Sequence, residues 1–587
     1  MYGGFVSAPA PSPRLAVYLA DRPAATGLTA RLAAAGLDAV FAEYLKDADV
    51  AAFDAFFADL ARADFAWVTR HREALLAGNR PGISGTLDPV SPGTLTGAHV
   101  ADCAKRGRTS LQRGEWASLV FAGGAATRFY AEAERFERAR EVIVRFGSTP
   151  PKALFPVTPV TGMSFFELFA AQTLYVAVTS GRMPPLLLMT SGATHDALRR
   201  FVAEADLQGF PREFITLVSQ REHPRLDDNG VLLARPDGHL VFTGDGHGGV
   251  FRALLERVGG GPSTLARLRG AGVRGIVLHN VDNAAARPLE PARLGFHLSG
   301  GYRMTITAVP RATLAEKVGL IARNAATGRI EVVEYSVCPR AVGEAALADG
   351  TPVFRLANIN TNLVSLDAVR ADLPPTLYTG KQVRIGDRLV PASSHEMLNQ
   401  HLAAILGPGE VGVLDVARDD YFLPTKNLAG DDSLEGTTSA LSRQAAAKLR
   451  AAGAEVAADA IVELDPCLGE SAEGLRRLGV GPGWRIGAGA VLYLGVRHGV
   501  DDAPPYGPGL VLEPGARLVV RADRPYGDVT VDPATRTVSV DATAASRIGI
   551  GADVTVAAGA RIEVRVARAA SRSISAGATL CGDDSQT

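Results

Sequence analysis

The pattern of apolar and polar positions divides the chain into three stretches. Residues 13–80 place apolar side chains three and four positions apart, as in Phe53, Phe56 and Phe57, which predicts amphipathic helices. From about residue 101 to residue 465, short strand-like apolar runs alternate with helical segments. Strands that alternate with helices predict a mainly parallel sheet with helices on both faces.

This pattern predicts an α/β protein with a doubly wound, Rossmann-like sheet between an N-terminal helical region and a C-terminal β-rich region. The expected domains are residues 1–100, 101–465 and 466–587. The stretch Gly78–Gly97 is dense in Gly, Pro, Ser and Thr, which predicts a linker or long loop. A further helix is expected from about Ser394 to Leu406. Strands are expected at Ser118–Ala122, Leu186–Met189, Phe214–Val218, Gly275–Val281, Arg303–Val309, Val318–Ile321, Ile330–Tyr335 and Val353–Asn358.

The last 122 residues contain no Lys, Met or Phe, and their short aliphatic runs are interrupted by Gly. An aliphatic residue followed by Gly at intervals of about six residues is typical of the turns of a parallel β-helix. The repeat is irregular. A β-sandwich and a plain β-meander therefore remain alternatives for this region.

Composition limits the function classes. The 587 residues include 61 Lys and Arg against 62 Asp and Glu, so no overall positive field favours nucleic acid. Four cysteines without metal-ligand spacing predict neither a disulfide framework nor a zinc site, which favours a reducing cytoplasm. The first residues lack the pattern of an export signal, and no apolar run reaches about 18 residues. We therefore expect a cytoplasmic protein that binds neither nucleic acid nor membrane.

The first chemically informative segment follows the expected strand Ser118–Ala122. Gly123 and Gly124 lie at the strand's carboxyl end, and a turn of small residues then leads to Arg128. Backbone amides and an Arg at such a position suit a phosphate group, although two glycines alone more often mark only a turn. The segment lacks the third glycine of a dinucleotide fingerprint and the Gly-Lys-Ser/Thr of a P-loop, so neither NAD binding nor ATPase chemistry is expected.

The run Phe121–Arg128, followed by Pro151–Val157, resembles the paired Gly-Gly and Pro-Lys signature of the UDP-N-acetylhexosamine and UDP-sugar pyrophosphorylases. The resemblance extends from about residue 117 to residue 450. Further blocks match in the same order, and ordered blocks make coincidence improbable: Ser164–Leu168, Leu188–His195, Ser219–Pro224, Gly244–Leu254, Val281–Asn283, Glu334–Ser336, Ala357–Ile359 and Phe422–Asn427.

The resemblance implies a nucleotidyltransferase fold of GT-A-like type and a reaction between UTP and a sugar 1-phosphate. The sugar phosphate is itself the nucleophile, so catalysis consists of positioning and charge neutralisation. Mg²⁺ is the implied cofactor, with Asp282 as its candidate ligand, directly or through water. The implied catalytic residues are Arg128, Lys152 and Lys426. The implied nucleotide-binding residues are Ala122, Gly123, Gly124, Gln220, Gly246, His247 and Asp282, and the implied sugar-binding residues are Gly248, Asn283, Glu334 and Asn358.

Simpler explanations exist for single residues of this set. Without the motif, Lys152 and Lys426 resemble ordinary solvated charges, Asp282 resembles a turn former, and Glu334 resembles the polar side of a strand. His195 opens a helix-like segment, which favours a structural role.

Two departures from the family pattern concern the placement of Arg128 at the phosphate site and the identity of the sugar. Residues 129–150 insert a charged, helix-like segment at 131–141 before Lys152, which suits a lid or a partner surface. Val337 stands where the N-acetylhexosamine branch has an acidic residue. An N-acetylhexosamine 1-phosphate is the expected substrate, with a UDP-glucose or broad-specificity enzyme as the alternative and a non-catalytic UDP-sugar-binding protein as the alternative of another class. The sequence does not indicate the oligomeric state.

Overall fold

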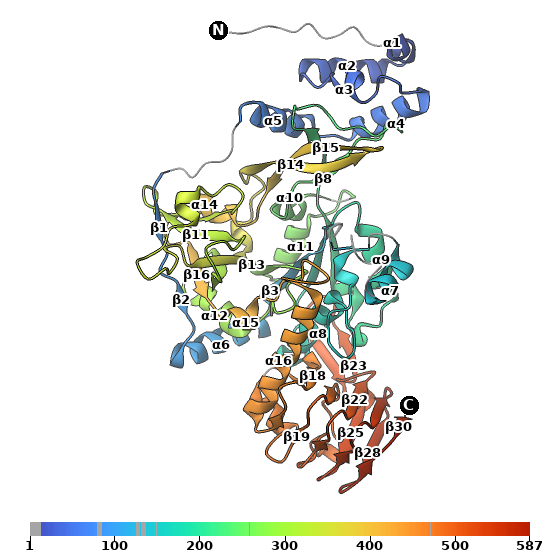
Figure 1. Ribbon diagram of the computed structural model, residues 1–587, viewed down its shortest axis with the longest axis vertical. Coiled ribbons are helices and arrows are strands. Elements are labelled where there is room, and N and C mark those ends of the chain that lie inside the picture. The colour runs from blue at the N-terminus through green and yellow to red at the C-terminus, as the bar shows by residue number, and fades with distance from the viewer. Residues whose placement is uncertain are drawn as a thin grey trace.

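A computed structural model describes residues 13–78, 85–124, 129–130, 137–147, 150–257, 259–469 and 471–586. The molecule is elongated, with the N-terminal helices at one end, the main sheet in the middle and the C-terminal strands at the other end (Figure 1). In the described residues, no helix combines the length and apolar character needed to cross a membrane.

The N-terminal region forms the predicted helices: α1 (Pro13–Leu19), α2 (Pro23–Ala34), α3 (Val40–Glu43), α4 (Val50–Ala61) and α5 (Phe65–Leu76). Asp49 and Asp64 cap α4 and α5 by accepting hydrogen bonds from backbone amides of the first turn. The buried rings of Phe53, Phe56 and Phe57 form the core of this region, together with apolar residues between 226 and 240. The helices therefore pack onto the central region of the chain instead of standing apart from it.

The central sheet is mixed and mostly parallel. Only β13 runs antiparallel to both of its neighbours on the main path, β9 and β10. Along that path the strands are β2 (Gly93–Thr94), β16 (Val411–Asp415), β10 (Met304–Pro310), β13 (Leu356–Ser365), β9 (Gly275–Asn280), β3 (Trp116–Phe121), β4 (Leu186–Thr190) and β5 (Ile215–Ser219). Three further strands extend the sheet beside β13: β11 (Gly319–Asn324), β12 (Ile330–Val333) and β1 (Leu87–Pro89).

Both faces of this sheet are covered, as the apolar runs predict. On β3, Val120 packs into one core with α8 (Phe165–Ser180), whereas Leu119 and Phe121 pack into another with α10 (Gly249–Leu255) and α11 (Thr264–Gly270). Alternate residues of a buried strand point to opposite faces, and both faces are covered here, so every residue of β3 is buried. The other helices of this region are α6 (Gly97–Gln112), α7 (Glu137–Phe146), α9 (His195–Glu204), α12 (Pro291–Ser299), α13 (Arg340–Gly343), α15 (Arg418–Tyr421) and α16 (Leu434–Ala452).

Two expectations were wrong, and both segments pair as strands. The expected linker supplies edge strands β1 and β2, which pair with β11 and β16. The helix expected from Ser394 begins instead at His401, as the short α14 (His401–Ile405). Residues 394–397 belong to β15 (Arg388–Met397), which pairs along its length with β14 (Pro375–Ile385). Cross-strand pairing outweighs the local pattern there. The short strand β7 (Leu226–Asp227) pairs with β15, and β6 (Glu222–Pro224) pairs with β8 (Phe242–Gly244).

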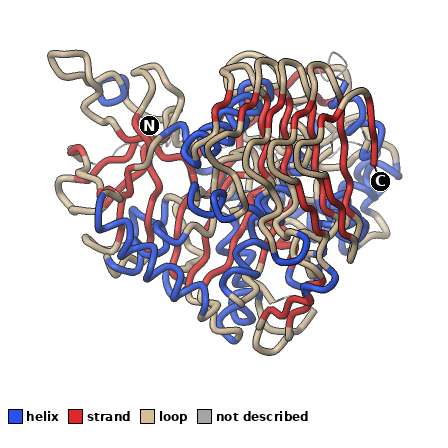
Figure 2. Tube along the Cα trace, turned by 90° about the horizontal axis from the view of Figure 1, so that it is seen from below, coloured by secondary structure: helices blue, strands red, loops and turns tan. Residues whose placement is uncertain are grey.

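The C-terminal region stacks short strands in parallel, unlike the antiparallel neighbours of a β-meander. In Figure 2 these strands run side by side on the right. One ladder aligns Leu492, Leu518 and Ile562, all buried. The first five-stranded ladder consists of β17 (Glu455–Val456), β19 (Arg485–Ile486), β21 (Val511–Leu512), β26 (Thr555–Val556) and β29 (Thr579–Leu580). The second consists of β18 (Ile461–Leu464), β20 (Val491–Leu494), β22 (Arg517–Ala522), β27 (Arg561–Val566) and β30 (Asp583–Gln586). They begin before the predicted boundary at residue 466.

The remaining C-terminal elements are short. Besides the two ladders, this region contains one two-stranded antiparallel sheet, one two-stranded parallel sheet and one helix. These elements are β23 (Asp528–Val531), β24 (Val538–Asp541), β25 (Arg547–Ile550), β28 (Ser571–Ile574) and α17 (Ala472–Arg477).

Candidate active site

The candidate site lies where three parallel strands end. Strands β9, β3 and β4 pair in parallel, with Phe121 level with Asn280 on one side and Met189 on the other. Their carboxyl ends therefore meet at one edge, where open α/β sheets bind ligands. Ala122, Gly123 and Gly124 continue from β3, and Asp282 follows β9 by two residues. Ala122 is held by a hydrogen bond from its amide to the Met189 carbonyl.

Lys152 and Asp282 form an ion pair at this edge. The Lys152 ammonium donates to Oδ2 of Asp282 at 3.1 Å and to the carbonyl oxygen of Thr425 at 2.9 Å. The side chains are 13% and 22% exposed, so the pair is partly shielded from water. The Phe129 ring lies 5.2 Å from the ammonium. Three predicted motifs that lie far apart in the sequence thus meet at one charged centre.

Asn283 holds the third of these segments in place. Its side-chain amide donates to the carbonyl of Tyr421, and its side-chain oxygen accepts from the amide of Leu423, both at 2.9 Å. Asn283 is buried, and the backbone of Thr425 also bonds to the Asp282 carbonyl. Both polar groups of the Asn283 side chain are committed to the backbone, which fits a positioning role better than the predicted sugar contact.

Lys426 directly follows the carbonyl that holds Lys152, but its own side chain turns outward. The ammonium pairs with Asp432 Oδ2 at 2.8 Å, and the side chain is 53% exposed. The backbone amide of Lys426 donates to the Asp432 carbonyl, which closes the loop between them. Lys426 therefore lies beside the charged centre without contributing to its hydrogen bonds.

Two glycines border the side-chain amide of Gln220. A methyl group on Gly244 would lie 2.4 Å from Gln220 Nε2, and one on Gly123 would lie 3.2 Å from the same atom. Gly244 is not among the predicted site residues, although it begins the block quoted above. In contrast, nothing lies within 4 Å of the position that a Gly124 side chain would take. The Gln220 amide thus lies between backbone segments that only glycine allows to approach so closely.

The predicted Gly246 and Gly248 pack against the end of β15 rather than bordering an open space. Gly246 has a φ of +83°, and a side chain there would lie 2.3 Å from the Met397 carbonyl oxygen. Gly248 donates its backbone amide to that same oxygen. In the described structure these two glycines allow the loop to contact the backbone at Met397 closely, and they do not border room for a nucleobase.

His247 is held by a residue that the sequence analysis did not identify. Its Nδ1 lies 3.1 Å from the backbone amide of Asn399 and 2.9 Å from the Asn399 side-chain nitrogen. Burial lowers the pKa of His247 to about 4, so the ring is neutral at physiological pH. Because Nδ1 accepts, the proton resides on Nε2, which makes that nitrogen a hydrogen-bond donor.

A chain of buried asparagines lies beneath His247. Asn399 donates to Asn360 at 2.6 Å, Asn360 donates to Asn280 at 2.7 Å, and Asn362 donates to Asn399 at 2.7 Å. Asparagine at alternate positions of one strand, from Asn358 to Asn362, is a signal in the sequence that the analysis did not use. The network links the end of β9, next to Asp282, to His247.

Glu334 and Asn358 lie near this network. Glu334 accepts a 2.6 Å hydrogen bond from Gln400, the neighbour of Asn399, and burial raises the pKa of its carboxyl. Gly319 faces it, and a side chain there would lie 2.9 Å from Glu334 Oε1. The Asn358 side-chain oxygen accepts from the Asn360 amide at 3.0 Å. This hydrogen bond uses the side-chain oxygen of Asn358 and not its side-chain amide nitrogen.

Some predictions lie at the edge of what the structure describes. Arg128 lies outside the described residues, as do residues 131–136 and 148–149 of the insertion. Most of the described part of the insertion forms α7. His195 begins α9, and its Nδ1 lies 3.0 Å from both the Thr190 and the Ser219 hydroxyls, as expected for a hydrogen-bond partner within the fold.

The metal prediction depends on one carboxylate. Among the described residues, no group of three or more acidic, His or Cys side chains could hold a metal ion alone. Asp282 is partly exposed, and only its Oδ2 bonds to Lys152. A single carboxylate suits Mg²⁺ only together with waters and substrate phosphates, which are the ligands that Mg²⁺ usually retains.

Comparisons with known proteins agree with the geometry. A family model described as UTP–glucose-1-phosphate uridylyltransferase matches residues 143–429. The UDP-N-acetylglucosamine pyrophosphorylase of Saccharomyces cerevisiae is 26% identical over 390 residues, which cover 63% of this chain and 77% of that protein. The chain is similar to the UDP-sugar pyrophosphorylases.

Solved structures show the same fold among UDP-sugar pyrophosphorylases. The UDP-N-acetylglucosamine pyrophosphorylase of Trypanosoma brucei aligns with a TM-score of 0.63 at 22% identity, over 77% of this chain and 94% of that one. A putative UDP-N-acetylglucosamine pyrophosphorylase of Entamoeba histolytica aligns with a TM-score of 0.59 at 21% identity, over 70% and 99%. The parallel-rich α/β sheet is thus the fold of this family.

Proposed function

We propose that the protein is a UTP:sugar-1-phosphate uridylyltransferase that forms a UDP-sugar and pyrophosphate. The observation that carries this proposal is the contact of Lys152 with Asp282 and the Thr425 carbonyl at the strand ends. Three motifs of the pyrophosphorylases converge there on a partly shielded cation. A phosphoryl-transfer reaction needs such a cation, and it needs no side-chain nucleophile.

In this reaction an oxygen of the sugar 1-phosphate attacks the α-phosphorus of UTP. The new bond joins that oxygen to the α-phosphorus, and the bond to the β-phosphate oxygen breaks with its electron pair, releasing pyrophosphate. Lys152 would stabilise the charge that develops on the leaving oxygens. Gln220, which carries one amide donor and one acceptor, would read the uracil edge, and the backbone at Gly123 and Gly124 would border the phosphates.

Asp282 would hold Mg²⁺ together with the phosphates of UTP. The bound ion would supply positive charge near the α-phosphate, in addition to that of Lys152. When UTP enters, the Lys152 ammonium can keep its bond to the Thr425 carbonyl while its contact with Asp282 changes. The ion pair would thus keep the lysine in place before the substrate binds.

For the sugar we propose an N-acetylhexosamine 1-phosphate, because the similar S. cerevisiae protein is named a UDP-N-acetylglucosamine pyrophosphorylase. A hexose 1-phosphate is the second candidate, since the matched family model is described by glucose 1-phosphate. Glu334 and Asn358 would hydrogen bond the sugar. Of the two residues, Glu334 is the stronger candidate to accept a hydrogen bond from a sugar hydroxyl or amide, because its carboxyl group is buried.

Two further proposals concern the whole chain. A cytoplasmic location is supported by the four cysteines, all of which are free thiols. A β-helix is supported for the C-terminal region by its parallel ladders.

Calorimetric titration tests the proposed substrates directly. UTP and a UDP-N-acetylhexosamine should each bind the protein with a dissociation constant below the millimolar range. ATP should bind much more weakly, since Gln220 matches uracil. The proposal fails if neither UTP nor any UDP-sugar binds at millimolar concentration.

A further inference from the structure

The loop that carries His247 is fixed along one side by the end of β15 and the residues that follow it. The amide of Met397 donates to the carbonyl oxygen of Asp245 at 2.8 Å, and the amide of Gly248 donates to the carbonyl oxygen of Met397 at 2.9 Å. Two residues further along, the backbone amide of Asn399 donates to Nδ1 of His247 at 3.1 Å. A backbone amide can only donate, so Nδ1 carries no proton in this arrangement.

The buried side chain of Asn399 adds a second donor to the same ring nitrogen. Its amide nitrogen lies 2.9 Å from Nδ1 of His247 and also donates to Oδ1 of Asn360 at 2.6 Å. Its oxygen accepts from the side-chain amide of Asn362 at 2.7 Å. Since Nδ1 offers only a lone pair, an oxygen at this place would be repelled, so the nitrogen is the end of Asn399 that faces the ring.

A bulge in β13 brings Asn360 to this contact. Residues 306 and 308 of β10 lie opposite residues 362 and 358 of β13, so β13 bulges between these two positions. Within the bulge Asn360 has a φ of +53°, in the left-handed region that asparagine tolerates better than most residues. Bulges next to active sites re-aim side chains, and the Asn360 side chain here reaches both Asn399 and Asn280. A strained backbone conformation is thus retained where it braces Asn399.

The second nitrogen of the His247 ring is not used by these contacts. Among the described residues no hydrogen bond reaches Nε2, and His247 keeps part of its surface exposed. The ring lies 5.4 Å from that of Phe121, the last residue of β3, which directly precedes the predicted nucleotide-binding residues 122–124. Nε2 is therefore the polar group that His247 can offer to a nucleotide at the strand ends.

Two titratable groups from neighbouring elements act on the His247 ring. Glu396 of β15 favours its charged form, and His401 of α14 favours its neutral form. Glu396 is itself paired with Lys381 at 3.2 Å and accepts from the Ser394 hydroxyl at 2.6 Å. Burial has a larger effect than either group and holds the pKa of His247 at about 4. The ring is therefore neutral at physiological pH, and the contacts at Nδ1 decide which nitrogen carries the proton.

We propose that Asn399 is a positioning residue that keeps the proton of His247 on Nε2, and that this N–H donates a hydrogen bond to an oxygen atom of the bound uridine nucleotide. The nucleotide contact rests on the proposed function, whereas the placement of the proton does not. Because the ring is uncharged, this donor selects an acceptor by its position and makes the same hydrogen bond throughout the physiological pH range. Asn360 contributes by fixing the orientation of the Asn399 amide.

The first experiment locates the proton in the absence of any nucleotide. The full-length protein carries isotope-labelled histidine, and the His247 signals in nitrogen–proton correlation spectra are assigned by their loss in His247→Gln. We expect the neutral form with the proton on Nε2 between about pH 6 and pH 9. A proton on Nδ1, or a mixture of the two neutral forms, would overturn the proposal. These wild-type spectra decide the point even if substitutions of the buried Asn399 do not fold.

The second experiment compares UTP binding by the wild type and by Asn399→Asp across the same pH range. The new carboxylate shares a proton with His247. When that proton is lost, the ring either keeps its remaining proton on Nδ1, which removes the donor at Nε2, or turns its Nδ1 lone pair toward the carboxylate. We expect the ratio of the variant's dissociation constant to that of the wild type to rise at least about tenfold from pH 6 to pH 9.

Two controls separate this role from a merely structural one. In a His247→Ala background, Asn399→Asp should leave the ratio independent of pH, because the ring through which Asn399 acts is gone. Asn324→Asp makes the same change at another buried asparagine, whose amide donates to Glu331, and it should also give a constant ratio. Thermal melting shows whether each variant folds.

A pH-independent ratio for Asn399→Asp in the wild-type background would refute the proposal. A pH-dependent ratio that persists without the His247 ring would refute it equally. Repeating the titrations with uridine assigns the acceptor: an effect shared by uridine places the oxygen on the nucleoside, an effect confined to UTP places it on the phosphates, and both support the proposal. If no uridine nucleotide binds while the wild-type spectra show the proton on Nε2, the proposed function fails and the positioning role of Asn399 stands.

Discussion

The Nζ atom of Lys152 lies 3.1 Å from Oδ2 of Asp282, although the two residues are 130 positions apart in the sequence. Each is held by a separate element: Lys152 by the short turn η2 (Lys152–Leu154), and Asp282 by the end of β9. A cation and an anion kept together in this way form the only ion pair that joins two of the predicted site residues within the described part of the chain. This pair gives the account its most direct mutational test.

Loss of the Lys152 charge should lower activity far more than loss of the Lys426 charge. Lys152→Met should reduce kcat/KM by about 10²–10³, as expected for a lost charge-stabilising group. Lys426→Met should cost about tenfold or less, since its ammonium faces Asp432 in solvent. Steady-state pyrophosphate release checks both variants. Full activity of Lys152→Arg would contradict the argument, because a guanidinium cannot reproduce the bonds of a compact ammonium at this position.

Gly244 should control nucleotide recognition through Gln220. Gly244→Ala places a methyl group 2.4 Å from Gln220 Nε2 and must displace that amide. We expect KM for UTP to rise about tenfold while kcat changes little, because the loss affects binding more than chemistry. Gly270→Ala is the control, since nothing lies within 4 Å of its added methyl. A Gly244→Ala enzyme with an unchanged KM for UTP would refute the assignment of Gln220.

Glu334 should act on the sugar rather than on the nucleotide. Glu334→Ala removes a buried carboxylate that Gln400 orients, and the loss of one charge-assisted hydrogen bond costs about 1.5–3 kcal/mol. KM for the sugar 1-phosphate should therefore rise by about 10–100-fold while KM for UTP stays constant. Glu331→Ala, on β12 just before Glu334, is the control, because Glu331 accepts from the Asn324 side chain instead. Equal effects of the two variants would count against a sugar contact.

The protein should lose stability below about pH 6.5. Burial lowers the pKa of His71 to about 3 and the pKa of both His223 and His395 to about 4. The Trp67 ring lies 4.6 Å from the His223 ring and 5.5 Å from the His395 ring, and His71 lies 5.4 Å from His395. Below pH 6.5 the unfolded chain binds protons that the folded chain excludes, so the free energy of unfolding falls as pH falls. At pH 5 each histidine contributes a loss of about 2 kcal/mol.

Urea denaturation at pH 7.5 and pH 5 measures this loss. Asp245 acts in the opposite direction, since burial raises the pKa of its carboxyl to about 7 and the folded chain then gains a proton on acidification. One carboxyl does not offset three histidines, so the urea midpoint should be lower at pH 5. An equal or higher midpoint at pH 5 would contradict the burial of uncharged histidines in this cluster.

The sequence predicts the elements that carry their own local signal. The buried strands around β3, the glycines after it and the Asp282-Asn283 turn after β9 lie where the apolar runs end, as expected for a parallel sheet. Lys152 is identified only because it stands in a recognisable motif. The separation in sequence between Lys152 and Asp282 gives no indication of their contact.

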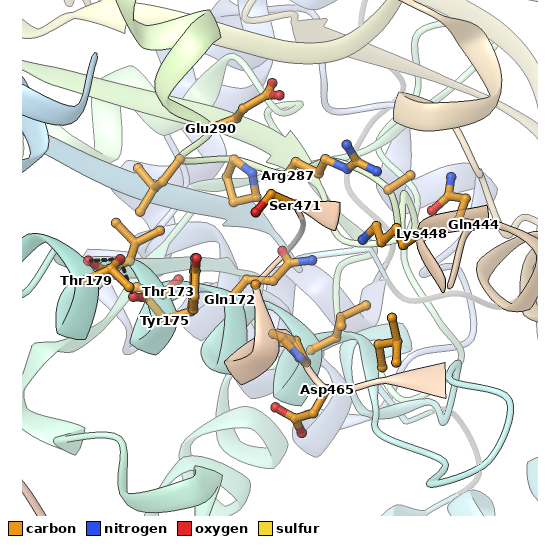
Figure 3. A pocket seen from close by; sticks show the side chains of 18 of the residues that line it. Gln172, Thr173, Tyr175, Thr179, Arg287, Glu290, Gln444, Lys448, Asp465 and Ser471 are labelled. Atoms are coloured by element: carbon orange, nitrogen blue, oxygen red, sulfur yellow. Dashed lines mark hydrogen bonds between the residues drawn. The ribbon is translucent and has the colours of Figure 1, made fainter. Parts of the chain in front are cut away.

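Other features depend on contacts that no local pattern reveals. Residues 394–397 form a strand because β14 lies beside them, and the partnership of His247 with Asn399 arises only when β15 packs on the loop at Gly246. Asn283 is well placed by the sequence, yet its role changes because residues 421–423 fold back onto it. The pocket that α6, α8, α16, the loop 284–291 and residues 462–469 enclose (Figure 3) likewise requires five segments to meet, so no local pattern in the sequence indicates it.

Pyrophosphate release from UTP is the measurement that tests the central claim most directly. The protein is mixed with UTP, Mg²⁺ and either an N-acetylhexosamine 1-phosphate or a hexose 1-phosphate, and pyrophosphate and UDP-sugar are quantified together. We predict equal amounts of both products, faster turnover with the N-acetylhexosamine substrate, and a loss of at least about 100-fold in Lys152→Met. Bound UTP without pyrophosphate release for any sugar 1-phosphate would contradict the claim that this protein is a uridylyltransferase.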